Sequence, residues 1–261
     1  MKNKTKKILN DNEMTGLKDA FKKLEEEKTY LKALEKKQED FIANISHEFK
    51  TPLTSIIGYA ETLLADPKNT DETSFRFLRK ISKNAKALSN LVDEILQLSR
   101  IESGALQLYY ENINLNQFIP EMMTDFFEKA KRKNQELKIT FSHDPIFLKV
   151  DPEILKEILS NLVDNAIKYT DEGGHILVAT NLKENHVEIS VSDDGIGIPE
   201  KYQHRIFERF FRVDKSRSRE AGGTGLGLAI VKHLVQAHKA EIKMQSELGQ
   251  GSVFTLFLKK T

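Results

Sequence analysis

Two apolar stripes in the N-terminal part of the chain constrain the fold more than any other feature. Between Phe41 and Leu64, and again between Leu78 and Ile95, apolar side chains recur every three or four residues, which is the periodicity of one helix face. The stripes comprise Ile42, Ile45, Phe49, Leu53, Ile56, Ala60 and Leu63, followed by Leu78, Ile81, Ala85, Leu88, Val92 and Ile95. Because the turn-forming residues 66–69 separate the stripes, we predict an antiparallel helical hairpin.

A single hairpin does not bury both stripes well. Two copies that pair into a four-helix bundle would cover them, so we expect a homodimer. The preceding residues 1–37 are rich in Lys, Glu and Asn, and their sparse apolar side chains include Leu17, Phe21, Leu24, Leu31 and Leu34. Several of these lie three, four or seven residues apart, which indicates a helical linker, either a coiled coil or a solvated helix.

Composition excludes several functional classes. The chain has 40 basic and 39 acidic side chains and a net charge of +1, so no overall field attracts nucleic acid or anionic lipid, and we expect no nucleic-acid partner. Because the chain has no cysteine, disulfides, thiolate metal sites and thiol catalysis are excluded. No apolar run approaches the roughly 18 residues that a membrane span needs, so we expect no direct membrane contact.

The sequence pattern changes after Gly104. Apolar and β-branched runs predict strands at 106–110, 137–141, 147–150, 176–180, 187–191, 242–245 and 252–258. Helical periodicity and start signals predict helices at 115–133, 152–169, 200–212 and 225–237. We therefore expect residues 105–261 to form one mixed α+β layer domain.

His47 lies on the first predicted hairpin helix. At 100° per residue it falls roughly 160° from the centre of the apolar stripe, and Thr51, one turn later, shares that exposed face. A neutral imidazole is a competent nucleophile near neutral pH, and a neighbouring carboxylate such as Glu48 can take its proton. An exposed histidine by itself is usually an ordinary surface residue, so this interpretation depends on the second domain.

Two patterns in the second domain suit a nucleotide. Asn161 and Asn165 share one helix face and can present amide oxygens to a hard cation, although ordinary helix surface explains them equally well. Lys168 and Tyr169 follow one turn later; the lysine cation suits a phosphate, and the tyrosine ring suits a nucleotide base. The run Asp193–Pro199 follows an apolar strand; its glycines permit close backbone approach to a flat ligand, and its carboxylate can accept from an exocyclic amine. Alone, such a turn is a weak motif.

Two further patterns suit phosphate. The run Gly222–Gly227 opens an apolar helix, whose N-terminal N–H groups attract anions, but it fits neither the Rossmann fingerprint nor the P-loop. The run Arg205–Arg212 alternates apolar and basic side chains, and alone it indicates only a surface helix with a loop. The polar stretch 213–221 between the two runs is expected to form a mobile lid.

Together these patterns resemble a known family. Phe41–Leu53 resembles the H-box of sensor histidine kinases, and the four later patterns resemble, in chain order, the N-box, G1 box, F-box and G2 box. The match runs from about residue 38 to 260 and is most similar to the phosphate-regulon and cell-wall-sensing types. It implies a helical linker over 1–37, a dimerisation and phosphotransfer hairpin over 38–104, and a Bergerat-type (GHKL) ATP-binding α/β sandwich over 105–261.

The resemblance also implies roles for single residues. His47 would be the phosphoacceptor, Glu48 the base, and Thr51 would position water during dephosphorylation of the partner. Asn165, helped by Asn161, would hold Mg²⁺, and Arg212 would approach the γ-phosphate of ATP. Lys168 would touch phosphate, Tyr169 would flank the adenine and Asp193 would read its amine. The remaining nucleotide-binding residues would be Gly195, Gly197, Ile198, Arg209, Gly223, Thr224, Gly225, Leu226 and Gly227.

The implied activity is ATP-dependent autophosphorylation on His47, followed by phosphotransfer to an aspartate of a response-regulator receiver domain, with phosphatase activity as a further capacity. Two alternatives remain open: an ATPase motor of the same nucleotide fold, and a non-enzymatic dimeric adaptor. Lys239-Ala240 departs from the Gly-Gly turn common in such kinases. We expect a cytoplasmic chain, either complete or the cytoplasmic portion of an inner-membrane sensor.

Overall fold

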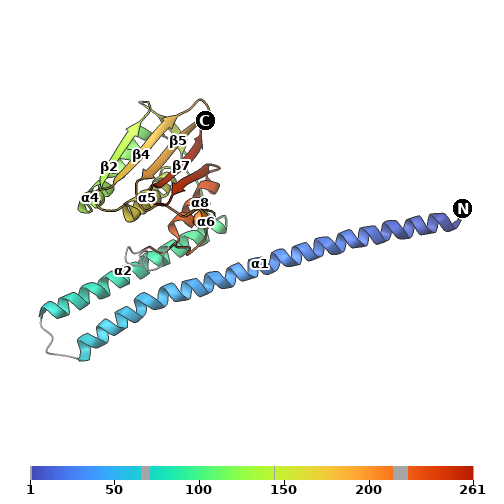
Figure 1. Cartoon of the computed structure of the whole chain (residues 1–261), viewed down its shortest axis with the longest axis horizontal. Helices are drawn as coiled ribbons and strands as arrows, with labels where there is room; N and C mark the ends of the chain where they lie inside the picture. Colours follow the sequence, from blue (N-terminus) through green and yellow to red (C-terminus); the bar gives the residue numbers. More distant parts are fainter. Residues whose placement is uncertain (1, 66–70, 144, 214–222, 261) are drawn as a thin grey trace. The chain divides into compact units, whose positions relative to one another are not determined.

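The computed structural model describes residues 2–65, 71–143, 145–213 and 223–260. Two long helices come first, α1 (Lys2–Ala65) and α2 (Asp71–Glu102), as Figure 1 shows. The predicted helices are therefore confirmed, while the predicted turn at 66–69 lies outside the described residues. Helix α1 continues without interruption through Pro52, although proline has no N–H to donate to the carbonyl of Glu48.

The chain divides into two compact units, residues 1–54 and 55–261. The first unit is the N-terminal part of α1. Its Leu24 and Leu31 side chains are exposed in the single chain, whereas Leu17, Phe21 and Leu34 lie outside the residues whose side chains are described. The choice between a coiled coil and a solvated helix therefore stays open.

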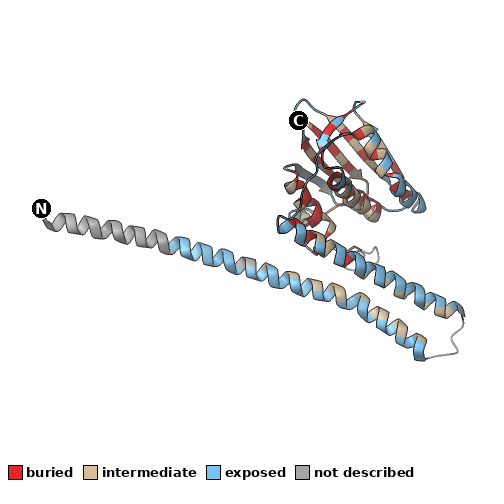
Figure 2. Cartoon of the chain, turned by 180° about the vertical axis from the view of Figure 1, so that it is seen from behind, coloured by how far each residue is buried: buried red, intermediate tan, exposed pale blue. Residues whose placement is uncertain are grey.

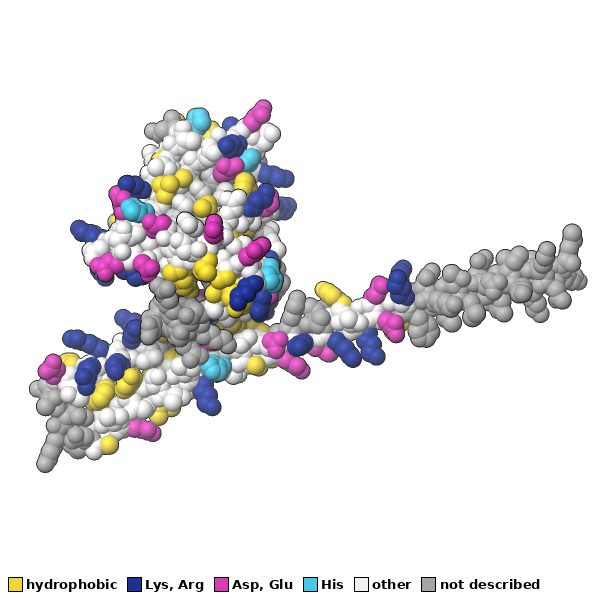
Figure 3. All heavy atoms as spheres, in the orientation of Figure 1, with side chains coloured by type: hydrophobic (Ala, Val, Ile, Leu, Met, Phe, Trp, Pro, Cys, Tyr) yellow, Lys and Arg dark blue, Asp and Glu magenta, His cyan; other side chains and the backbone are white. Residues whose placement is uncertain are grey.

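The second unit begins with the last turns of α1 and with α2. The ring of Tyr59 stacks on that of Phe77, with centroids 5.6 Å apart, and the Lys80 ammonium lies 4.9 Å from the centroid of the Tyr59 ring. These contacts join the two helices as a hairpin. Apolar side chains such as Leu64 and Leu78 nevertheless stay at the surface of the single chain. Figure 3 shows hydrophobic and charged side chains side by side on the surface of the described residues.

A two-layer α/β domain follows the hairpin. One layer is a five-stranded sheet in the order β2-β4-β5-β7-β6, in which β2 is parallel to β4 and the other pairs are antiparallel. Its strands are β2 (Glu136–Phe141), β4 (His175–Leu182), β5 (His186–Asp193), β6 (Glu241–Glu247) and β7 (Gly251–Lys259). Strands β1 (Glu111–Asn114) and β3 (Phe147–Val150) form a separate antiparallel pair.

Helices form the second layer, and the core lies between the layers (Figure 2). They are α3 (Leu115–Met122), α4 (Thr124–Arg132), α5 (Pro152–Tyr169), α6 (Glu200–Gln203) and α8 (Gly227–Ala237). Helix α5 is central, because it packs against α8 and β5 and because Ile158, Leu159 and Leu162 are at most 1% exposed. The predicted α/β sandwich is confirmed.

Two predicted elements before α5 are wrong in detail. No strand forms at 106–110, because the N–H of Tyr109 donates to the Asp151 side chain instead of to a neighbouring strand. The helix predicted at 115–133 is divided at Met123 into α3 and α4. Pro120 has no N–H to donate, and the Thr124 hydroxyl donates to the carbonyl of Glu121, which competes with the backbone ladder.

The helix predicted at 200–212 is also wrong beyond its first turn, because only Glu200–Gln203 is helical. Phe210 has a φ of 59°, and its N–H donates to the carbonyl of Gly225 at 2.9 Å. This left-handed residue turns the chain so that an apolar ring enters the core, which a continuous helix would not allow. The amphipathic pattern of the F-box therefore arises from a folded loop.

Asp151 connects the start of α5 to the segment after the hairpin. Its carboxylate accepts hydrogen bonds from the N–H groups of Glu153 and Ile154, as an N-cap does, and from Tyr109 at 2.7 Å. Asp151→Ala is expected to lower the free energy of unfolding by about 1–2 kcal/mol through the lost cap alone. Urea denaturation followed by circular dichroism measures this loss.

Asp151→Asn is the matched control. It keeps an oxygen for the helix cap and loses only the acceptor for Tyr109, so it is expected to cost less, about 1 kcal/mol. Equal losses for the alanine and asparagine variants would contradict a separate contribution from the cap.

Candidate functional site

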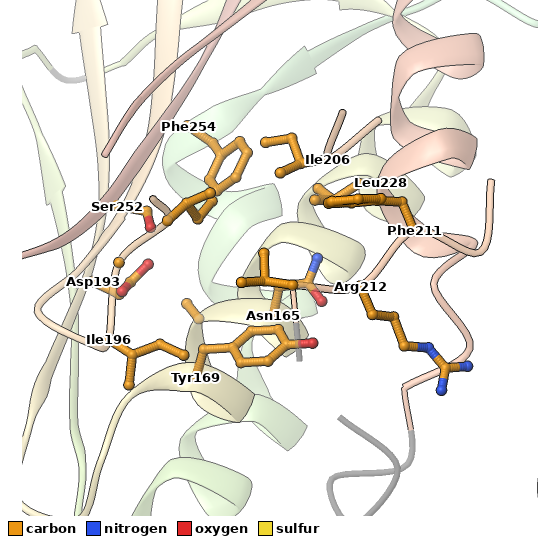
Figure 4. Close-up of a pocket in the computed structure, with 14 residues that line it drawn as sticks. Asn165, Tyr169, Asp193, Ile196, Ile206, Phe211, Arg212, Leu228, Ser252 and Phe254 are labelled. Atoms are coloured by element: carbon orange, nitrogen blue, oxygen red, sulfur yellow. The ribbon is translucent and has the colours of Figure 1, made fainter. Parts of the chain in front are cut away.

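A cavity opens beside α5, at the end of strand β5 (Figure 4). It is lined by Asn165, Ala166, Tyr169, Asp193, Ile196, Gly197, Ile198, Ile206, Phe211, Arg212, Val213, Leu228, Ser252 and Phe254. The structure therefore brings together six residues that were predicted from the sequence: Asn165, Tyr169, Asp193, Gly197, Ile198 and Arg212. They come from α5, from the end of β5 and the turn that follows it, and from the loop after α6.

Asp193 provides a carboxylate at one end of this cavity. Burial raises its pKa, and hydrogen bonds from the backbone of Gly195 and Ser252 lower it only in part. One of these bonds, from the N–H of Gly195 to Oδ1, is 3.0 Å long. The carboxylate is therefore held in a fixed position, where it can accept a hydrogen bond from a ligand.

The walls beside Asp193 are mainly apolar. Ile206, Leu228 and Phe254 face the cavity from one side in Figure 4, and the Tyr169 ring lies on the other. Flat aromatic ligands bury well between such walls, and a single polar group sets their orientation. The Arg212 side chain lies at the opposite end from Asp193, with Asn165 between them. The cavity thus suits a ligand with a flat amine-bearing ring at one end and negative charge at the other.

Glycines in the turn after β5 permit close backbone packing. A Cβ on Gly195 would lie 2.4 Å from the carbonyl oxygen of Tyr169, and a Cβ on Gly197 would lie 1.9 Å from that of Glu247. Gly197 also has a φ of 64°, which favours glycine. These residues shape the cavity by letting the turn pass close to α5 and to the end of β6.

The other predicted residues of α5 lie outside the cavity lining. The Asn161 amide donates to the carbonyl of Glu157 at 3.0 Å, and its Oδ1 lies 2.6 Å from where a Cβ on Gly227 would stand. This oxygen therefore faces the start of α8. Burial lowers the pKa of the Lys168 ammonium, while the carboxylates of Asp164 and Glu94 raise it in part.

The glycine-rich turn before α8 has structural contacts of its own. A Cβ on Gly225, whose φ is 80°, would meet the backbone of Phe210 at 2.9 Å. Leu226 is fully buried, so its side chain belongs to the core. The Thr224 hydroxyl donates to the carboxylate of Glu94 at 2.5 Å. Gly223, which precedes it, is half-buried.

Arg209 does not line the cavity. Its guanidinium donates to the carboxylate of Glu102, the last residue of α2, and Nε2 of His233 lies 3.2 Å from the same oxygen. The three predicted residues of the hairpin lie in the first unit, where His47 is exposed and Glu48 is half-buried. The Thr51 hydroxyl donates to the carbonyl of His47 at 3.3 Å.

Eight lining residues were not predicted from the sequence: Ala166, Ile196, Ile206, Phe211, Val213, Leu228, Ser252 and Phe254. Most are apolar, so nothing in the sequence distinguishes them from core residues. Ser252 offered one signal, because it follows a glycine at the start of a predicted strand. The α2 carboxylates Glu94 and Glu102 were also missed, because contacts between a helix and a distant loop leave no local pattern.

The chain matches two protein families. Residues 37–104 match the His Kinase A (phospho-acceptor) domain, and residues 150–261 match the histidine kinase-, DNA gyrase B- and HSP90-like ATPase family. The fold and the cavity thus define a protein with a phosphoacceptor hairpin and an ATPase-type domain.

Individual relatives agree with these matches. Sensor histidine kinase WalK of Bacillus subtilis is 37% identical over 227 residues, 86% of this chain and 37% of WalK. The phosphate regulon sensor protein PhoR of Pseudomonas aeruginosa is 36% identical over 227 residues, 87% of this chain and 51% of PhoR. The chain therefore spans about half or less of the length of these curated relatives.

Solved structures of the histidine kinase ThkA extend the comparison. Its catalytic domain is 30% identical with a TM-score of 0.53, and the match covers 59% of this chain and 97% of that domain. ThkA in complex with the response regulator protein TrrA is 26% identical with a TM-score of 0.66, over 85% of this chain and 61% of the other. The chain belongs to the sensor histidine kinases, of the phosphate-regulon or cell-wall-sensing type. In the part of the chain that the structure describes, no helix is long and apolar enough to cross a membrane.

Replacing Gly197 tests the close packing under the cavity. An alanine in the left-handed conformation costs roughly 1–2 kcal/mol. Gly197→Ala is expected to lower the free energy of unfolding by more than this, because its Cβ also meets the carbonyl of Glu247. Gly249→Ala is the matched control, since Gly249 has a φ of 81° and open space around its Cβ position. Urea denaturation compares the two variants, and equal losses would contradict the close approach.

Proposed function

We propose that this chain is an ATP-dependent protein histidine kinase that phosphorylates itself on His47 and passes the phosphoryl group to an aspartate of a response-regulator receiver domain. The observation that carries the proposal is the cavity of Figure 4, with the Asp193 carboxylate at one end and Arg212 at the other. An adenine between the apolar walls would donate its exocyclic amine to Asp193. Its triphosphate would then extend past Asn165 toward Arg212 and Lys168, whose charges complement the phosphates.

Phosphoryl transfer to His47 needs a nucleophile and a base. A ring nitrogen of His47 attacks the γ-phosphorus, the bond from the γ-phosphorus to the bridging oxygen breaks, and ADP leaves with the negative charge. Glu48 takes the proton of the imidazole. In the second step an aspartate oxygen of the receiver attacks the phosphorus, the P–N bond breaks, and the imidazole recovers its proton. The exposure of His47 suits both steps, because each partner must reach the ring.

The residues present fit a magnesium ion held with the nucleotide. The amide oxygen of Asn165, which lines the cavity, is a hard ligand of the kind that Mg²⁺ takes together with phosphate oxygens. Asn161, whose Oδ1 faces the start of α8, would help from one turn earlier on the helix. The described residues contain no cluster of three or more His, Asp, Glu or Cys that would hold a metal on its own. When bound, Mg²⁺ would neutralise charge on the phosphates.

We further propose that the chain works as a homodimer paired through the hairpin. In the single chain Ile42, Leu53, Ile57 and Leu78 are between 46% and 55% exposed, and a second copy would cover these apolar side chains. On this proposal residues 1–37 are a helical linker, 38–104 the dimerisation and phosphotransfer domain and 105–261 the ATP-binding domain. Thr51, one turn from His47, would position water when the receiver is dephosphorylated.

The receiver-domain partner has its own support. The similar kinase ThkA was solved in complex with a response regulator protein. An ATPase motor of the same nucleotide fold would have no need of an exposed histidine on a helical hairpin, which disfavours that alternative. An adaptor without activity would have no need of Asp193 held at a cavity by backbone hydrogen bonds.

Incubation with γ-labelled ATP and Mg²⁺ tests the proposed reaction. The native chain is expected to gain a label that is acid-labile and base-stable, as a phosphohistidine is. His47→Gln should lose the label but still bind ATP, and Asn165→Ala should lose label because the phosphates and cation are misplaced. Sustained ATP hydrolysis without any label on the protein would support the ATPase motor. Absence of both ATP binding and label would support the adaptor.

The pH dependence of nucleotide binding tests the role of Asp193. Because burial raises the pKa of Asp193, its carboxylate is protonated at a higher pH than the ordinary value of 3.8 predicts, and ATP affinity should fall as the pH is lowered through that range. Asp193→Asn should weaken binding roughly tenfold to hundredfold, as the loss of a charged acceptor does. Calorimetric titrations should give a flatter pH profile for this variant; parallel profiles would count against the assigned role.

A further inference from the structure

Helix α2 has a second apolar face near its C-terminus. Leu91, Leu98 and Ile101 are 3%, 1% and 9% exposed, and α2 packs against α8 of the α/β domain. Val92 and Leu96, on the other side of the helix, remain exposed in the single chain. The stripe predicted from the sequence therefore covers only one of two faces, and the other docks α2 onto the α/β domain.

Polar contacts accompany the apolar side chains of the docked face. Glu94 accepts from the Thr224 hydroxyl at 2.5 Å, the Gln97 amide donates to Glu157 of α5, and Glu102 binds the Arg209 guanidinium. Each contact joins α2 to a different part of the α/β domain. The docked state is thus specified by paired side chains as well as by apolar burial.

Glu94 lies among the groups that are proposed to hold the triphosphate. The Thr224 hydroxyl that donates to Glu94 also accepts from the N–H of Leu226 at 3.2 Å, just before α8, so the carboxylate is near the positive end of that helix. Burial raises the pKa of Glu94, and the hydrogen bond from Thr224 and the charges of Lys168 and Arg212 lower it in part.

We propose that Glu94 is an internal anion that competes with the phosphates of the nucleotide, so that docking of α2 and full ATP binding oppose each other. The inference rests on the proposed ATP site. Thr224, Lys168 and Arg212 provide a limited set of donors, and a carboxylate beside a triphosphate is repelled at short range. Because coupling between two binding events is reciprocal, bound ATP weakens the docking of α2 by the same factor by which docking weakens ATP.

This competition differs from a purely mechanical role of Glu94. If Glu94 only held the domain together, its loss would change the whole cavity and affect every ligand alike. If it competes with phosphate, the effect depends on the charge of the ligand and is absent for adenosine, which occupies the Asp193 end alone. The series of ATP, ADP and adenosine therefore separates the two roles.

The test uses the full chain and calorimetric titration with these three ligands. Glu94→Gln keeps the size of the side chain and an acceptor for Thr224 but removes the charge. It should tighten ATP binding by about fivefold or more, the lower end of ordinary coupling, and ADP binding by less. The affinity of Glu94→Gln for adenosine should stay within about twofold of that of the native chain. Asp93→Asn is the matched control, because Asp93 is the exposed neighbour on the same helix, and it should leave all three affinities unchanged.

Hydrogen exchange measures the reciprocal effect. Saturating ATP should raise exchange in the segment 91–102 of the native chain, and saturating adenosine should not. Unchanged ATP affinity in Glu94→Gln, or an equal change for adenosine, would overturn the inference while leaving the ATP site intact. If the native chain bound none of the three ligands, the proposed function itself would fail.

Discussion

The burial of helix α5 against the sheet is the constraint on which the candidate site depends. Ile158, Leu159 and Leu162 are almost completely removed from water, and this apolar face fixes the rotation of the helix about its axis. Asn165 and Tyr169 are thereby directed to the cavity. A helix free to rotate could not hold an amide and an aromatic ring in fixed positions relative to a carboxylate on another element.

Close approach of backbone segments supplies the opposite side of the site. A Cβ on Gly251 would lie 1.9 Å from the carbonyl oxygen of Asp193, so the start of β7 passes directly against the end of β5. Ser252, the next residue, hydrogen-bonds through its backbone to the Asp193 carboxylate. The carboxylate therefore keeps its position because two strands pack without intervening side chains, and its raised pKa follows from the same burial.

Helix α2 connects this site to the hairpin. One face, which includes the exposed Val92 and Leu96, is free to pack in a helical bundle, and the opposite face is buried against the α/β domain. Glu94 belongs to the buried face, where it accepts from Thr224. A helix with two partners can transmit a change at one of them to the other, because gains in one contact are felt as losses in the competing one. Under the proposed competition, this dual patterning would let occupancy of the cavity bear on the hairpin.

Periodicity in the sequence determined the hairpin, helix α5 and the strands from β4 onward, because their apolar spacing is local and strong. The chemical types at Asn165, Asp193 and Arg212 were also readable, since each lies in a recognisable box. Only the tertiary structure decided that residues 204–212 form a folded loop, where Phe210 adopts a left-handed conformation to pack against Gly225. It also decided that Arg209 and Thr224 bind carboxylates of α2, because such contacts depend on which surfaces meet and leave no periodic trace along the chain.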